Sequence, residues 1–296
     1  MTFNLRSSAR QRVTPGIATH RGRWRAREVR IPVAGLPRRA GRYVENSRRG
    51  VPVASVRMDH TWMLDEQACA GGEHLDRAFV AAYDRKQGTA PDEAAAADLV
   101  VLRAHGIGAG STVVDLGAGT GRFAAAVAPH VARLIAVDVS EAMLERLEQR
   151  LAAADVAANV EVVRCGLLHY EHQGAPADAV HSRNVLHQLP DAFKALALHR
   201  IARILRPGGV LRLRDLVYDT TPDRLATHLE DWFAAAVEDP AVGYTAQELA
   251  EHVRTEHSTF TWLLEPMLDQ AGFDIVDRSV HRGVYAAYTC LRRPHT

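Results

Sequence analysis

The sequence lacks several features that would place it in other classes of protein. No hydrophobic run approaches the roughly 20 residues that a membrane-spanning helix requires. The three cysteines, Cys69, Cys165 and Cys290, are odd in number and have no paired spacing, which argues against a disulfide framework. We therefore interpret them as reduced core thiols of a cytoplasmic protein that has no membrane association.

Metal-binding patterns are also missing, although the chain has 15 histidines. None of these histidines forms H-E-x-x-H or a comparable cluster. His252 and His257 flank Glu256, but their five-residue spacing places the two rings on different faces of a helix. The sequence thus predicts no metal site.

Residues 1–57 differ from the rest of the chain in charge. They contain fourteen Arg, no Lys and two acidic residues, a net charge of +12, so residues 58–296 carry −11 because the whole chain carries +1. The segment has few long apolar residues and no sustained period, and we predict that it is disordered because it cannot bury enough surface to offset its ordering entropy. It is a nucleic-acid arm, a transit-like segment, or translated sequence upstream of a start at Met58. Arg without Lys favours the last of these.

The composition of the remaining chain limits its partners. With 296 residues and 47% hydrophobic content, the protein can bury one large core. A body with a charge of −11 is a poor match for a polyanion, because phosphate contacts supply most of the affinity for nucleic acids. We therefore expect a small-molecule partner and no nucleic acid.

A glycine-rich loop follows the apolar stretch 112–114. Asp115 is followed by three glycines at alternate positions, Gly117, Gly119 and Gly121. Such a loop lets a ligand lie against bare backbone and the N-terminus of the next helix. A dinucleotide loop has the pattern G-x-G-x-x-G, whereas Arg122 stands here in place of its last glycine. Because Asp115 would repel a pyrophosphate and attract an ammonium group, the loop disfavours NAD(P).

The pattern D-x-G-x-G-x-G resembles motif I of the class I S-adenosylmethionine (SAM)-dependent methyltransferases. The resemblance extends from about residue 75 to residue 293. It includes a helix, then Pro207-Gly208-Gly209, then an apolar strand over 210–217. The resemblance implies a methyltransferase enzyme with SAM as its cofactor.

A second predicted strand, over 134–137, ends in Asp138 and Val139. A carboxylate at this position can accept hydrogen bonds from both ribose hydroxyls of a nucleotide-type cofactor. The alternative is that Asp138 only caps the following helix. We include Asp138 and Val139 among the predicted cofactor-binding residues.

The third and fourth predicted strands also end in candidate residues. At the end of the third strand the family usually carries a carboxylate for the adenine amino group, whereas this chain has Cys165-Gly166. We therefore expect backbone or apolar contact with adenine at Gly166. The fourth strand leads to Asn184 in a segment that resembles the small-molecule version of motif IV, without the Pro-Pro-aromatic box of relatives that methylate nucleobases or glutamine.

Alternating strand and helix patterns predict a Rossmann-like, doubly wound α/β fold. The expected sheet is seven-stranded and mostly parallel, with helices on both faces and an antiparallel closing strand. Ligands in such folds bind at the carboxyl ends of the strands, so the strand-end residues should converge on one site. We divide the chain after the first 57 residues into an N-terminal helical cap segment, 58–106, and a SAM-binding domain, 107–296, with a helical lid insertion at about 218–270.

Two segments outside the sheet complete the predicted site. In related enzymes an N-terminal segment with a tyrosine folds over the methionine end of the cofactor, and Tyr83 matches it here; alternatively, its ring packs on the sheet. The lid insertion is dense in aromatic residues, including Trp232 and Trp262. Core packing explains most of them, while one or two can line an apolar acceptor pocket.

The charge of the sulfonium determines the expected mechanism. Its methyl group is already activated, so the enzyme mainly has to hold a nucleophile in line behind it, at about 3 Å. A base is needed only if the acceptor must lose a proton. Our candidate is His187, which is otherwise a buried residue at a helix start; Asp215 and His257 are weaker candidates.

The expected function is therefore methyl transfer from SAM to a small-molecule acceptor. The alternatives are an RNA or protein methyltransferase, a non-catalytic binding protein with the same fold and, less favoured, an NAD(P)-dependent oxidoreductase. The sequence determines neither the acceptor nor the atom that is methylated.

Overall fold

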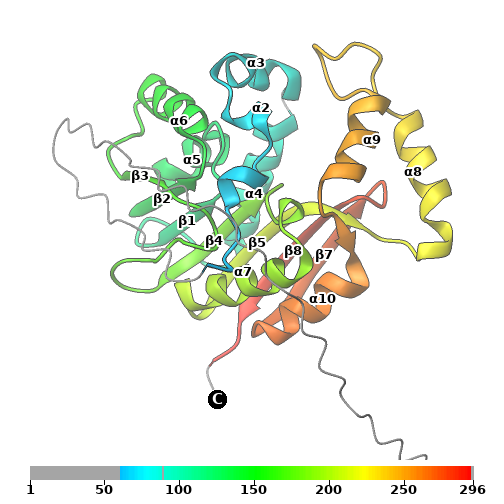
Figure 1. Cartoon of the computed structure of the whole chain (residues 1–296). Helices are drawn as coiled ribbons and strands as arrows, with labels where there is room; N and C mark the ends of the chain where they lie inside the picture. The colour runs from blue at the N-terminus through cyan, green and yellow to red at the C-terminus, as the bar shows by residue number, and fades with distance from the viewer. Residues whose placement is uncertain (1–60, 89, 295–296) are drawn as a thin grey trace, which may run out of the picture. The chain divides into compact units, whose positions relative to one another are not determined.

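An eight-stranded sheet forms the centre of the described chain (Figure 1). The computed structural model describes residues 61–88 and 90–294, so the disorder predicted for residues 1–57 lies outside the described residues. The strand order is β3-β2-β1-β4-β5-β8-β7, and the short β6, which the sequence did not predict, pairs with β5. The strands are β1 (Thr112–Leu116), β2 (Arg133–Asp138), β3 (Val160–Arg164), β4 (Ala177–Arg183), β5 (Leu205–Tyr218), β6 (Thr259–Phe260), β7 (Phe273–His281) and β8 (Tyr285–Arg292).

The direction of the strands confirms the predicted fold class. Strands β1 to β5 pair in parallel with their neighbours, whereas β8 runs antiparallel to both β5 and β7. The central strands are apolar almost throughout because helices cover both of their faces. The polar residues that end these strands therefore lie together at one edge of the sheet.

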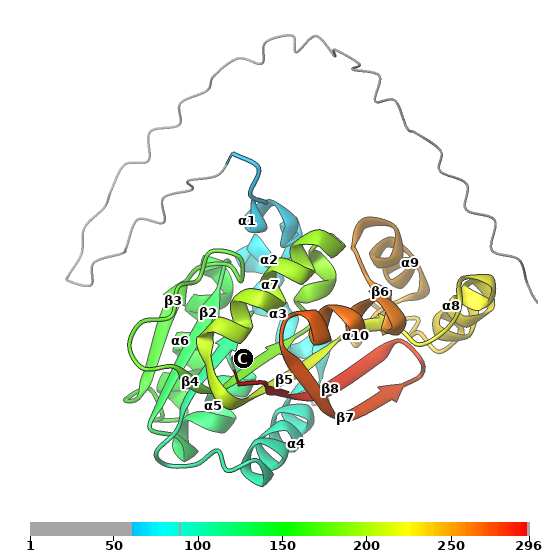
Figure 2. The ribbon, with the colours of Figure 1, turned by 90° about the horizontal axis from the view of Figure 1, so that it is seen from below.

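Helices α4, α5 and α6 cover one face of the sheet, and α7 and α10 cover the other (Figure 2). On the first face Leu102, Phe123 and Leu147 belong to one hydrophobic cluster with β1 and β2. The helices are α1 (Glu66–Cys69), α2 (Gly72–Leu75), α3 (Arg77–Gln87), α4 (Ala90–Ala104), α5 (Arg122–Val127), α6 (Glu141–Ala153), α7 (Asp191–Ile204), α8 (Leu225–Ala234), α9 (Ala246–Thr255) and α10 (Thr261–Gln270), with short 3-10 turns at Ala128–His130, Leu186–Gln188 (η2) and Pro222–Arg224.

The boundary between α7 and β5 differs from the prediction. The sequence predicted a helix that Pro207-Gly208-Gly209 would stop, but α7 already ends at Ile204 and these three residues lie within β5. The register between β4 and β5 shifts between Ala177 and Ala179, and this irregularity accommodates the extra residues. A proline and two glycines therefore mark a bulge here.

Part of the predicted lid insertion belongs to the main core. Leu264 and Leu268 of α10 are buried in the same cluster as α7 and the sheet. Helices α8 and α9 instead form a separate hydrophobic cluster around Trp232 and Leu249. The segment that stands apart from the sheet is thus shorter than 218–270.

The described residues contain no disulfide, and the three cysteines have different surroundings. Cys290 is buried in the core as predicted, whereas Cys69 and Cys165 are partly exposed.

Among the described residues, no helix combines the length and the apolar character that crossing a bilayer would require.

The last glycine of the motif I loop, Gly121, allows the start of α5 to pack closely against α6. Gly121 has a φ of +79°, and a Cβ atom there would lie 2.6 Å from Cγ of Leu147. A side chain at this position is therefore opposed by both backbone strain and steric overlap.

We expect Gly121→Ala to lower the free energy of unfolding by roughly 2–4 kcal/mol, from backbone strain and overpacking together. Gly106→Ala is the matched control, because Gly106 has a φ of +83° and nothing within 4 Å of its Cβ position. The control should cost about 1–2 kcal/mol, from the backbone alone. Urea unfolding measures both values, and equal costs would contradict the contact with Leu147.

Candidate functional site

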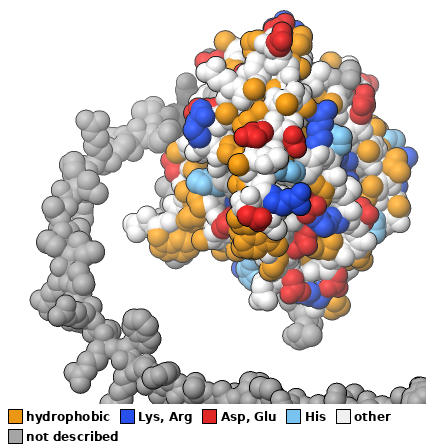
Figure 3. Space-filling model, turned by 90° about the vertical axis from the view of Figure 1, so that its right-hand side faces the viewer, with side chains coloured by type: hydrophobic (Ala, Val, Ile, Leu, Met, Phe, Trp, Pro, Cys, Tyr) orange, Lys and Arg blue, Asp and Glu red, His pale blue; other side chains and the backbone are white. Residues whose placement is uncertain are grey.

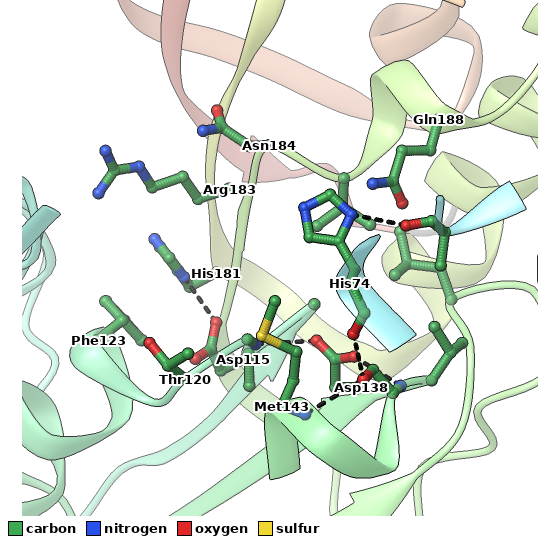
Figure 4. A pocket seen from close by; sticks show the side chains of 18 of the residues that line it. His74, Asp115, Thr120, Phe123, Asp138, Met143, His181, Arg183, Asn184 and Gln188 are labelled. Carbon is green, nitrogen blue, oxygen red and sulfur yellow. Dashed lines mark hydrogen bonds and ion pairs between the residues drawn. The ribbon is translucent and has the colours of Figure 1, made fainter. Parts of the chain in front are cut away.

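A cavity opens at the carboxyl ends of β1, β2 and β4 (Figure 4). It is bounded by the motif I loop, the loops that follow β2, β3 and β4, and the N-terminal helices α1 to α4. Most of the cofactor-binding residues predicted from the sequence line it: Tyr83, Asp115, Gly117, Gly119, Asp138, Val139, Gly166 and Asn184. Gly121 does not line it, because this glycine serves the packing of α5 on α6.

Asp115 presents a carboxylate oxygen without a hydrogen-bond partner. Oδ1 of Asp115 accepts a hydrogen bond of 2.7 Å from Nδ1 of His181, a residue of β4. Oδ2 is buried and has no hydrogen-bond partner among the described residues. A buried carboxylate oxygen without a partner is costly, so this position favours a donor or a cation supplied from the cavity.

The orientation of Asp115 depends on its neighbour His181. The ring of His181 stacks on Phe123 at a centroid distance of 3.6 Å, and its Nε2 lies 3.5 Å from Asp98. Burial alone would lower the pKa of His181, but the carboxylates of Asp115 and Asp98 raise it above its usual value. The two carboxylates thus favour the protonated ring, and the hydrogen bond from Nδ1 orients Oδ1 of Asp115 toward His181.

Asp138 closes the second strand with both oxygens bound to backbone. Oδ2 accepts from the amide of Gly119 and Oδ1 from the amide of Ser140, each at 2.8 Å. The cap of α6 is Ser140, whose Oγ accepts from the amide of Met143. Each carboxylate oxygen can accept a further hydrogen bond, so Asp138 is available to a ligand in the cavity.

Near Gly166 the structure contains a carboxylate that the sequence analysis did not identify. A Cβ atom at residue 166 would lie 2.0 Å from Oε2 of Glu66, so the missing side chain makes room for this carboxylate. Glu66 belongs to α1, lines the cavity, and accepts hydrogen bonds from the amide of Leu168 and from Nδ1 of His169. Burial raises its pKa, although these hydrogen bonds oppose the shift. No local signal marks Glu66, because it stands about a hundred residues before β3 ends.

Helix α3 is fixed to the motif I loop by one carboxylate. Asp84 accepts from Oγ1 of Thr120 at 2.7 Å and also pairs with Arg122 and Arg150. The preceding residue, Tyr83, is partly buried at the cavity, with its ring 5.8 Å from that of His74. The cap segment is thus held directly over the glycine-rich loop.

The loop after β4 approaches the motif I loop closely. Gly117 has a φ of +77°, and a Cβ atom there would lie 2.1 Å from Cγ2 of Val185. Asn184 also has a positive φ, +56°, and its backbone N–H donates to the backbone carbonyl of Arg214. Figure 4 shows Arg183, Asn184 and Gln188 around the same cavity.

The three candidate bases, His187, Asp215 and His257, do not line this cavity. His187 is buried, with Nδ1 2.5 Å from Asp215 and Nε2 2.8 Å from Glu256. Burial lowers its pKa, but the two carboxylates outweigh burial and raise the pKa to about 9. Because both ring nitrogens contact carboxylates and the ring lies outside the cavity, His187 is not positioned to take a proton from a substrate there, which corrects its assignment as the base.

Asp215 and His257 have structural contacts instead of access to a substrate. The carboxylate of Asp215 accepts from the amides of Leu186 and Leu216, both at 2.7 Å, and so holds the turn after β4. His257 is exposed, and its amide donates to the carbonyl of His187. The structure therefore gives neither residue a position for catalysis.

Two histidines of the described chain line the cavity, His181, which is paired with Asp115, and His74 (Figure 4). Unlike His181, His74 has no hydrogen bond or ion pair with a carboxylate among the described residues. Its Nδ1 is 2.7 Å from the carbonyl of Ala70 and donates to it, since a carbonyl can only accept. In the neutral ring, Nε2 is then an acceptor. Sequence reasoning missed His74 because nothing in the short helix α2 distinguishes it from the other histidines.

Comparison with known proteins gives one consistent result. The family described as methyltransferase domain matches residues 113–209. Demethylmenaquinone methyltransferase of Clavibacter sepedonicus is 31% identical over 189 residues, which cover 62% of this chain and 73% of that protein. A ubiquinone/menaquinone biosynthesis C-methyltransferase of Pseudomonas putida is 29% identical over 204 residues, 62% of this chain and 76% of the relative.

Solved structures agree at the level of the fold. The structure of magnesium protoporphyrin IX methyltransferase from Synechocystis, which contains bound SAM, superposes with a TM-score of 0.54 at 16% identity and covers 79% of this chain and all of that chain, 100%. Sheet order, the motif I loop and the relatives thus lead to the same assignment. The chain belongs to the class I SAM-dependent methyltransferase family.

Proposed function

We propose that the protein transfers a methyl group from SAM to a small-molecule acceptor by in-line displacement. The main observation behind this proposal is Oδ2 of Asp115, which is buried and has no hydrogen-bond partner among the described residues. Asp115 lines the cavity, next to a loop whose glycines have no side chains. An ammonium group satisfies this oxygen, whereas a pyrophosphate would be repelled by it. SAM carries such an ammonium group on its methionine part.

The other cavity residues fit the remaining parts of SAM. Asp138 can accept from the ribose hydroxyls, as carboxylates at this strand position do for nucleotides. The backbone at Gly117 and Gly119 approaches the ligand without a side chain between them. Glu66, which occupies the space left by Gly166, is placed to accept from the adenine amino group. When bound, SAM supplies an activated methyl group, and the protein excludes water and positions the acceptor.

The relatives support a small-molecule acceptor. Their names assign them to demethylmenaquinone and to ubiquinone/menaquinone biosynthesis. The face of the molecule in Figure 3 carries acidic and basic side chains interspersed, without an extended basic patch. This distribution favours a small acceptor over RNA, because nucleic-acid binding relies on clustered positive charge. Where the acceptor is a hydroxyl, we assign the role of base to Nε2 of His74.

Replacement of Asp115 by Asn should weaken SAM binding by roughly 30-fold or more, because the loss of one partner of a buried charge pair costs about 2–5 kcal/mol. Isothermal calorimetry measures this affinity. Methylthioadenosine is the control ligand, because it lacks the amino-acid part, and its affinity should be unchanged in Asp115→Asn. Equal losses for both ligands, or tight binding of NADH by the wild type, would contradict the proposed site.

Glu66 should determine the preference for adenine. We expect the wild type to bind S-adenosylhomocysteine at least about 10-fold more tightly than S-inosylhomocysteine, whose carbonyl oxygen would face the carboxylate. Glu66→Gln should narrow this ratio, since an amide can donate to that oxygen. The neighbouring Asp65→Asn is the control, as Asp65 only caps α1. An unchanged ratio in Glu66→Gln would remove Glu66 from adenine recognition.

Turnover tests the role of His74. With SAM and a panel of hydroxylated aromatic acceptors, the wild type should release S-adenosylhomocysteine, and His74→Gln should reduce kcat by about 10²–10⁴-fold while SAM affinity stays within about 2-fold. His199→Gln serves as the control, because His199 is exposed on α7. A full rate in His74→Gln with a hydroxyl acceptor would show that another group removes the proton.

A further inference from the structure

The end of helix α9 meets the turn η2 in a cluster of two histidines and a glutamate. His252 and Glu256 stand one helical turn apart, and His187 reaches them from η2. One ligand atom from each of the three residues lies within 4.8 Å of the others. The spacing of His252 and His257 suggested no metal site, but the tertiary structure replaces His257 with a residue from a distant loop.

The distances within the cluster suit ligands of one ion. Nε2 of His187 lies 2.8 Å from Oε2 of Glu256, and Nδ1 of His252 lies 3.1 Å from Oε1. Metal–nitrogen and metal–oxygen bonds of about 2.0–2.2 Å place neighbouring ligand atoms roughly 3 Å apart. Oε2 of Glu256 is buried and lies 2.8 Å from Nε2 of His187 without the alignment of a hydrogen bond, so it keeps a lone pair for an ion.

Both histidines are oriented by a second contact on the other ring nitrogen. Nδ1 of His187 contacts the carboxylate of Asp215, and Nε2 of His252 contacts Oγ of Ser258 at 3.2 Å. When these nitrogens donate, Nε2 of His187 and Nδ1 of His252 retain their lone pairs. Metal-binding histidines usually have such an acceptor on the second nitrogen, which fixes the tautomer and the ring direction.

The surroundings favour a doubly charged cation. Glu256 and Asp215 together carry two negative charges near the cluster. Glu256 also follows the last turn of α9, where the carbonyl end of the helix dipole favours positive charge. The ring of Trp232 lies edge-to-face against His252 at a centroid distance of 6.3 Å, and the side chains of His252 and Glu256 are 16% and 25% exposed.

We propose that His187, His252 and Glu256 bind one divalent transition-metal ion of the zinc class, which ties α9 to the turn after β4. Two imidazoles and a carboxylate are the ligands that Zn²⁺ takes in sites with three protein ligands. The same turn carries Gln188, which lines the SAM cavity, so the ion positions one wall of that cavity. The alternative to a metal ion is a His187 ring that is protonated on both nitrogens and pairs with Asp215 and Glu256.

Metal analysis of the full chain tests the proposal. After incubation with Zn²⁺ and gel filtration, the wild type should retain one zinc ion per chain by mass spectrometry. His252→Ala and Glu256→Gln should each weaken zinc binding by about 100-fold or more, since even changes to groups that orient a ligand cost 10–100-fold. His199→Ala and Glu251→Gln are the matched controls, because both residues are exposed, and Glu251 lies on α9 itself.

Further measurements distinguish the loss of a metal ligand from a variant that fails to fold. Co²⁺ should give visible d–d absorption bands in the wild type that are absent in His252→Ala, and circular dichroism should show that the variants keep their helices. Zn²⁺ should also raise the Tm of the wild type and leave that of Glu256→Gln unchanged. The proposal is overturned if the wild type retains no zinc, or if all variants retain it equally. A drop in Tm for Glu256→Gln without any zinc binding by the wild type would assign the cluster to the proton.

Discussion

A buried charge cluster holds the cofactor edge of this protein together. His181 lies between the carboxylates of Asp98 and Asp115, and Asp98 in turn accepts from Arg212 and Arg214, each at 2.7 Å. Burial raises the pKa of Asp98, but these cations lower it below its usual value. The cluster joins α4, β1, β4 and β5. It leaves Oδ2 of Asp115 without a hydrogen-bond partner among the described residues, and this is the oxygen to which the proposed ammonium contact is assigned.

The segments that enclose the cavity are attached by charges as well. Asp84 fixes α3 to the motif I loop through Thr120 and Arg122, and Lys86 of α3 pairs with Glu248 of α9. The side chains of Asp84 and Arg122 are each 13% exposed, and ion pairs at such partly buried positions are worth more than at an open surface. Helix α3 therefore contacts both the glycine-rich loop and the N-terminal turn of α9.

The succession of strands and helices along the chain, and most residues that line the cavity, follow from local sequence. Asp115, the alternate glycines and Asp138 each come directly after an apolar run, and parallel strands bring their carboxyl ends to one edge of the sheet. This rule placed Gly166 and Asn184 at the same cavity without any knowledge of long-range contacts. The structure also confirms the predicted antiparallel closing strand, since β8 runs antiparallel to both β5 and β7.

Local sequence by itself thus determined the fold class and the loops that line most of the cavity, because hydrophobic periodicity and glycine spacing depend on neighbouring residues. Only the tertiary structure decided which side chains meet across the chain. It placed Glu66 in the space left by Gly166, and it put His74 into the cavity in place of His187. It also joined His187 to Glu256 of α9. These contacts depend on how separate elements pack, and the spacing of residues along one segment carries no information about a partner on another.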